Sequence, residues 1–112
     1  MKFDTDENGL HTLFRPYQAL LIEHLWDLNR NAKVGINSGQ AHRFLQDTPE
    51  KKSRASVINS LNDMVDERIL EYEERSGKGG YHRVYYPKMN KEEFSVYVTE
   101  LINDKLKEVF LS

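Results

Sequence analysis

The chain has 112 residues, of which 30% are charged and 38% hydrophobic, with a formal net charge of −2 and no cysteine. This length supplies one domain, and the composition is typical of a globular protein and too apolar for disorder. The lack of cysteine excludes disulfide scaffolds, thiolate metal sites and a cysteine nucleophile. The acidic start lacks a signal-peptide run, and the longest apolar run, residues 19–22, is too short to span a bilayer. We therefore expect a cytoplasmic protein without a membrane segment.

One amphipathic helix is predicted near the start of the chain, after a polar lead-in over residues 1–14. Apolar residues recur at helical spacing from 17 to 28. Pro16 stands directly before them, at a position where its missing N–H is not needed. Trp26 on this helix is expected to pack in the core. Residues 33–37 leave room for a very short strand.

Two further helices are predicted from their capping residues. Ser38 is a good N-cap for a helix from Gly39 to about Gln46, and Ser53 for a helix from Arg54 to about Glu67. The break between them, 47–50, is short, so the two helices are expected to pack against each other as a pair.

A hairpin and a last helix complete the chain. Residues 69–75 and 81–86 are predicted strands, the second ending at a proline, and 76–80 is a glycine-rich turn. Asn90 and Glu93 resemble a capping box, which begins a helix running to about Phe110.

The order of these elements predicts the fold class: mainly α with a small β-hairpin, in the form of a winged helix-turn-helix plus a C-terminal helix. The predicted organisation is a lead-in over 1–14, a winged-helix domain over 15–89 and a dimerisation helix over 90–112.

The outward side of the helix from Arg54 to about Glu67 favours contact with DNA bases. Away from its apolar stripe it presents Ala55, Asn59, Asn62 and Asp66, flanked by Ser56 and Asp63. In a major groove, Asn59 can pair with adenine, Ser56 with any base and Ala55 with a thymine methyl group. The alternative is that these are permissive surface positions.

Charge placement also favours nucleic acid. Residues 51–62 and 75–88 contain Lys51, Lys52, Arg54, Arg75, Lys78, Arg83 and Lys88 but no acidic residue. Phosphate contacts need local positive charge, even on a chain that is acidic overall. The predicted contacts with double-stranded DNA are Lys51, Lys52, Ser53, Arg54, Ala55, Ser56, Asn59, Arg75, Lys78 and Arg83.

Other chemistry is not indicated. Gly77–Lys78 lacks the following Ser or Thr, and the following helix, of a phosphate-binding loop. The four histidines are dispersed without metal-ligand spacing, and no nucleophile stands beside a base. We expect no enzyme activity, no cofactor and no metal.

The last helix has a wide apolar face, which predicts a homodimer. The residues expected at that interface are Phe94, Tyr97, Val98, Leu101, Ile102, Val109 and Phe110. The alternative is that this helix folds back onto its own core.

Residues 17–88 resemble the winged helix-turn-helix of the penicillinase-repressor and multiple-antibiotic-resistance repressor group. The resemblance is carried by residues 53–70, with Val57 and Leu61 four apart, and by the ending 83–87. It implies a transcriptional regulator, a repressor, whose third helix reads DNA and whose C-terminal segment dimerises. Arg68 stands where these families place glycine, so the sequence does not decide whether the backbone makes a left-handed turn there.

Two further departures concern the end of the chain and copper. The C-terminal part is a single helix, and the cysteine motif of the related copper-responsive repressors is absent. The alternative function is a winged-helix protein-interaction module that does not bind DNA.

Overall fold

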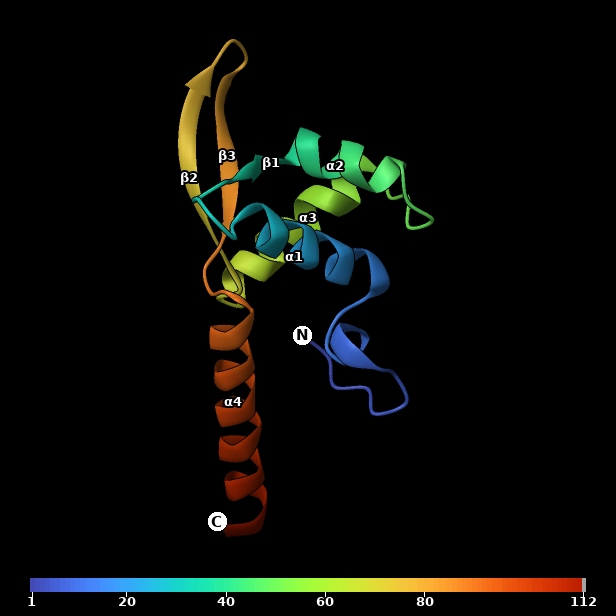
Figure 1. Ribbon diagram of the computed structural model, residues 1–112, viewed down its shortest axis with the longest axis vertical. Coiled ribbons are helices and arrows are strands. Elements are labelled where there is room, and N and C mark those ends of the chain that lie inside the picture. Colours follow the sequence, from blue (N-terminus) through green and yellow to red (C-terminus); the bar gives the residue numbers. More distant parts are fainter. Residues whose placement is uncertain (112) are drawn as a thin grey trace.

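The computed structural model describes residues 1–111; position 112, the last residue of the predicted dimerisation helix 90–112, lies outside the described residues. Helices and a small sheet alternate along the chain (Figure 1). The elements are η1 (Gly9–Thr12), α1 (Pro16–Leu28), β1 (Ile36–Asn37), α2 (Ser38–Gln46), α3 (Arg54–Asp66), β2 (Leu70–Gly77), β3 (Gly80–Pro87) and α4 (Lys91–Leu111). Across residues 1–111, no helix is long and apolar enough to cross a bilayer.

The sheet is antiparallel with strand order β1-β3-β2. Gly77 pairs with Gly80, so Lys78 and Gly79 alone form the turn of the hairpin. Gly80 has a φ of 98°, a conformation that glycine adopts without steric cost. The hairpin is confirmed, with strands one or two residues longer at the turn than predicted. β1 pairs with β3 at two positions, Ile36 opposite Tyr85 and Asn37 opposite Val84, which joins the base of the hairpin to the helices.

The core lies between α1, α2 and α3 and the base of the sheet, where the apolar faces predicted for these helices meet. Its fully buried side chains include Phe14, Leu21, Ile22, Leu25, Leu45, Val57, Leu61, Met64 and Leu70. Trp26, expected in the core, packs against its edge and is partly buried. The predicted fold class is confirmed: mainly helical, with a hairpin after the third helix and a separate C-terminal helix.

Most predicted helix caps are present. The Ser53 hydroxyl accepts from the Ser56 amide at 3.1 Å, and Asn90 and Glu93 bond reciprocally at the start of α4. At α2 the predicted cap Ser38 is wrong, because Asn37 takes this role and Ser38 is already helical. Asn37 accepts from the Gln40 amide at 2.8 Å, and the Gln40 side chain accepts from the Asn37 amide at 2.8 Å.

Arg68 forms the left-handed turn that the sequence left open. Its φ is 65°, the only positive value outside glycine among the described residues. The Arg68 and Ile69 amides donate to the carbonyls of Val65 and Met64, which closes the end of α3. Arginine therefore takes a backbone conformation that glycine adopts without steric cost.

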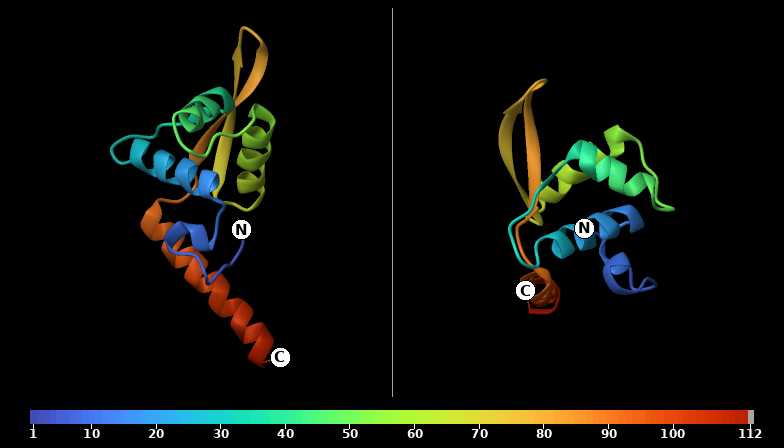
Figure 2. Two further views of the ribbon diagram at one scale, coloured as in Figure 1. Left: turned by 90° about the vertical axis from the view of Figure 1, so that its right-hand side faces the viewer. Right: turned by 45° about the horizontal axis from the view of Figure 1, so that its top comes forward.

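The lead-in over residues 1–14 doubles back on itself. The Lys2 amide donates to the Leu13 carbonyl at 2.9 Å, and the Asp4 amide donates to the Thr12 carbonyl at 2.8 Å. The Met1 ammonium forms an ion pair with Glu67, just beyond α3. This segment thus lies against the body of the protein and close to α4 (Figure 2).

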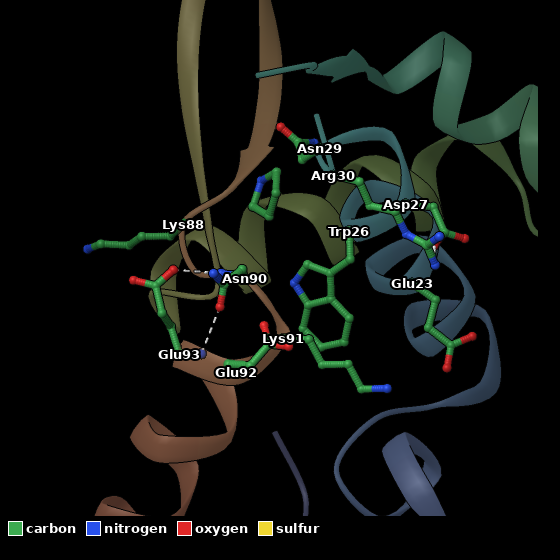
Figure 3. A pocket seen from close by; sticks show the side chains of 11 residues that line it. Glu23, Trp26, Asp27, Asn29, Arg30, Lys88, Asn90, Lys91, Glu92 and Glu93 are labelled. Carbon is green, nitrogen blue, oxygen red and sulfur yellow. Dashed lines mark hydrogen bonds and ion pairs between the residues drawn. The ribbon is translucent and has the colours of Figure 1, made fainter. Parts of the chain in front are cut away.

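The helix α4 projects from the body in the direction opposite to the hairpin (Figure 1). Its first turns pack on the rest of the chain through Val98 and Phe94, and the Phe94 ring lies 5.9 Å from Phe14 and 5.7 Å from Trp26. The Trp26 indole N–H donates to the Met89 carbonyl at 3.0 Å. Figure 3 shows Trp26 in the hollow between the end of α1 and the Asn90 cap of α4. This junction sets the direction of α4.

Candidate nucleic-acid interface

The start of α3 brings together seven of the predicted contacts, four of which are Ser53, Ala55, Ser56 and Asn59. Ser53 caps the first turn of α3, and the side chains of Ala55 and Asn59 on that helix are exposed. Ser56 is half-buried, and its hydroxyl oxygen accepts a hydrogen bond from Ser53 at 3.0 Å, which leaves its own proton available. These side chains are short, so a DNA base edge can approach the helix backbone closely.

Three cations border this surface. Lys51 is exposed, and the Lys52 ammonium lies 5.2 Å from the centre of the Tyr17 ring. The Arg54 guanidinium donates to the Ser38 hydroxyl at 3.2 Å, at the start of α2. Within residues 1–111, none of these three cations forms an ion pair with a carboxylate. Their charge is therefore available to an anionic partner.

A shallow hollow connects the start of α3 to the wing. Arg54 lines it together with Arg43 of α2 and His82 of β3, at the first residues of α2. Two arginines and the positive end of a helix dipole make this hollow electropositive. It extends the basic surface from α3 toward the hairpin.

The wing cations have closer partners. The Arg75 guanidinium donates to the Tyr86 hydroxyl at 2.6 Å and lies 3.4 Å from a Glu73 carboxylate oxygen. The same carboxylate accepts from Lys33 at 3.3 Å, and this bond is the main reason that the pKa of Glu73 falls below its ordinary value. Glu73 is thus ionised and offsets the charge of Arg75.

Arg83 is turned toward α3 and not toward solvent. Its guanidinium donates to the Asn62 side-chain oxygen at 3.0 Å and lies over the Tyr72 ring, 4.0 Å from its centre. The Tyr85 hydroxyl donates to the same Asn62 oxygen at 2.6 Å. Glu74 is the cross-strand partner of Arg83. Of the three predicted wing contacts, only Lys78 has no ion pair or hydrogen bond among residues 1–111.

Asn62 lies on the outward side of α3, as predicted, but is absent from the predicted DNA contacts. The roles of Tyr72 and Tyr85 were not predicted either. The only sequence signal was the alternation of aromatic and polar residues in the two strands, which indicates a common face. Which residues lie opposite one another depends on the turn, and the predicted turn was too long.

The predicted dimerisation residues are divided between two environments. Phe94 is 4% exposed and belongs to the core of its own chain. Tyr97, Val98, Leu101 and Ile102 are half-buried, whereas Val109 and Phe110 are 70% and 77% exposed. An apolar groove of about 410 Å³ runs along α4 beside the lead-in. It is lined by Met1, Lys2, Phe3, Leu13, Val98, Leu101, Ile102, Lys105, Leu106 and Val109.

A helix, a two-residue strand, two further helices and a hairpin wing, in this order, define a winged-helix protein. The chain is similar to the crystal structure of a PadR family transcription regulator from hypervirulent Clostridium difficile. The TM-score is 0.50 at 13% sequence identity, over 86% of this chain and 99% of the other. This likeness shows a shared fold. No family model matches the sequence, and no curated protein matches it.

Proposed function

We propose that this chain is a transcriptional regulator, a repressor, that binds a specific sequence of double-stranded DNA. The helix α3 lies in the major groove, and the wing contacts the flanking backbone or minor groove. The observation that carries the proposal is the start of α3: small outward side chains beside three cations without ion pairs within residues 1–111. The similarity in fold to a PadR family transcription regulator supports the same function.

The contacts divide by chemistry. Lys51, Lys52 and Arg54 are placed to neutralise phosphates, and Ala55 and Asn59 to meet base edges. Ser53 and Ser56 contribute hydroxyl groups at the first turn. In the wing, Lys78 is the side chain best placed for a phosphate, because Arg75 and Arg83 have partners within the protein.

The test is selection from a pool of random duplex DNA, followed by anisotropy titrations of the selected site at several salt concentrations. We expect one enriched sequence and an affinity that falls steeply with salt, because each neutralised phosphate releases counterion. A protein-interaction module, the alternative, enriches no sequence, and its partner binding through apolar side chains changes little with salt. Lack of enrichment at low salt contradicts the proposal.

The proposal includes a homodimer formed through α4. The exposed Leu106, Val109 and Phe110 and the adjoining groove form an apolar surface that the rest of the described chain leaves open. Phe94 is excluded from this surface because its own core covers it. Two-fold symmetry sets two copies of α3 about one turn of DNA, or a multiple, apart, and predicts a palindromic site.

Replacing Leu101 and Val109 by Glu tests the dimer, because both line the groove and burial of a carboxylate there is costly. Sedimentation is expected to show a dimer for the original chain and a monomer for the double variant, with weak DNA affinity. Lys107→Glu, on the opposite side of α4, is the control and remains dimeric. A monomeric original chain that still binds a palindrome tightly contradicts the dimer.

A further inference from the structure

The side chain of Asn62 lies between the recognition helix and the wing. Asn62 is on α3, on the side away from the core, and is half-buried. Its side-chain oxygen accepts two hydrogen bonds from the wing, from Arg83 at 3.0 Å and from Tyr85 at 2.6 Å. Its amide nitrogen has no hydrogen-bond partner among residues 1–111.

Chemistry fixes which end of the Asn62 amide faces the wing. A guanidinium group only donates, so the atom beside Arg83 is the oxygen and not the nitrogen. Burial raises the pKa of Tyr85 above its ordinary value, so this phenol keeps its proton and also donates. Both lone pairs of the oxygen are then used, and the two N–H groups are the free hydrogen-bonding groups of the side chain.

The wing residues that hold Asn62 are themselves fixed. The Arg83 guanidinium lies 4.0 Å from the centre of the Tyr72 ring, and the Tyr72 and Tyr85 rings are 6.4 Å apart. Tyr85 is 2% exposed. Turning the Asn62 amide by half a turn loses the bond from Arg83, which can only donate, and brings the Asn62 N–H groups against the Arg83 donors. The orientation of the amide is therefore set before any ligand arrives.

We propose that Asn62 selects guanine in the DNA site. The inference rests on the proposed function, in which α3 occupies the major groove. A free asparagine pairs with adenine by donating to N7 and accepting from the N6 amino group. Asn62, whose oxygen is engaged, only donates. Guanine presents two acceptors, N7 and O6, whereas cytosine presents an amino donor that the Asn62 N–H groups repel. Guanine is preferred, and cytosine is the least favoured base.

The decisive variant is Asn62→Asp, assayed by selection from random duplex DNA. Aspartate keeps an acceptor for Arg83 and Tyr85, so the contact with the wing survives, but it replaces the N–H donors by a second acceptor. The preferred base at that position is expected to change from guanine to cytosine, because the carboxylate accepts a hydrogen bond from the cytosine amino group. The variant should bind the site with cytosine about tenfold more tightly than the site with guanine. Asn31→Asp, the same change in the loop after α1 and outside the proposed interface, is the matched control and leaves this position as guanine.

A second variant tests the contact with the wing directly. Arg83→Met with Tyr85→Phe removes both donors and retains side chains of similar size, so the Asn62 amide turns freely. Adenine then competes with guanine at the same position, while Arg75→Met leaves the preference unchanged. Thermal unfolding checks that each variant folds.

The outcomes separate the two proposals. Lack of an enriched sequence with the original chain contradicts the proposed function and this inference with it. Two results overturn this inference alone. In the first, Asn62→Asp changes the preferred base at no position of the enriched sequence. In the second, the base position that responds to Asn62→Asp is adenine in the sequence that the original chain selects.

Discussion

The start of α3 and the wing each supply three cations to the proposed interface, and those cations have different neighbours. At the start of α3, Lys51, Lys52 and Arg54 have no ion pair within the described residues. In the wing, Arg75 is paired with Glu73 and Arg83 is bonded to Asn62. Equal numbers of cations therefore present unequal amounts of available charge.

The difference follows from where the nearest carboxylates lie. Lys51 and Lys52 precede α3 and Arg54 begins it, and the near neighbours of Lys52 and Arg54 are the Tyr17 ring and the Ser38 hydroxyl, not carboxylates. In a hairpin, the nearest neighbours come from the opposite strand and from two residues along the same strand. Residues 75–88 contain no acid, but Glu73 and Glu74 lie just outside this window and contact it.

Charge reversal at the start of α3 is expected to have the largest effect. Lys51→Glu with Arg54→Glu should weaken DNA binding by about a hundredfold at low salt and lower the salt slope by about two, since two phosphate contacts are lost. Titration by anisotropy at several salt concentrations measures both quantities. Lys88→Glu with Lys91→Glu, at the junction with α4, is the matched control. Equal losses in the two double variants contradict the placement of DNA on α3.

Removal of one wing carboxylate is expected to strengthen binding. Glu73→Gln frees Arg75 and Lys33 from their ion pairs, so affinity should rise by about threefold, with a steeper dependence on salt. The control is Glu71→Gln, which removes a carboxylate from the same strand without freeing a cation, and which should give a smaller gain. Equal gains in DNA affinity for Glu73→Gln and Glu71→Gln, or no gain for either, contradict the conclusion that Glu73 offsets the charge of Arg75.

The smallest expected effects distinguish two cations within the wing. Lys78→Gln should weaken binding by about threefold and lower the salt slope by about one, because Lys78 is exposed at the turn without an ion pair among residues 1–111. Arg75→Gln should change affinity by less than about twofold, because Glu73 already offsets its charge. The same titrations measure both. A larger loss for Arg75→Gln than for Lys78→Gln contradicts the assignment.

Local signals in the sequence were sufficient for most helix boundaries. The Ser53 cap and the Asn90–Glu93 box act within one turn of their own helices, so neighbours in sequence determine them. The start of α2 was assigned one residue late because Asn37 and Ser38 are both competent caps. Gln40, three residues after Asn37, completes a capping box and was the available signal for the earlier start.

Tertiary contacts determined what the sequence left open. An arginine in the left-handed region costs about 1–2 kcal/mol, which argues against that conformation locally. The turn at Arg68 nevertheless places Ile69 and Leu70 in the core, 3% and 2% exposed, and this burial outweighs the cost. Similarly, the contact of Arg83 with Asn62 joins residues 21 apart, and its partner atoms follow from hairpin register and not from either segment alone.

Because α4 is attached to the body only near its first residues, a small change of angle there moves its far end by a large distance. The helix comprises 21 residues and is anchored at its base by Phe94 and by the bond from Trp26 to Met89. At 1.5 Å per residue its length is about 31 Å. A tilt of about 10° at that base would move the far end by about 5 Å, more than the 3.4 Å rise of one base pair. A small change in the packing around Trp26 would therefore displace the C-terminal end of α4 by more than the distance between two neighbouring base pairs.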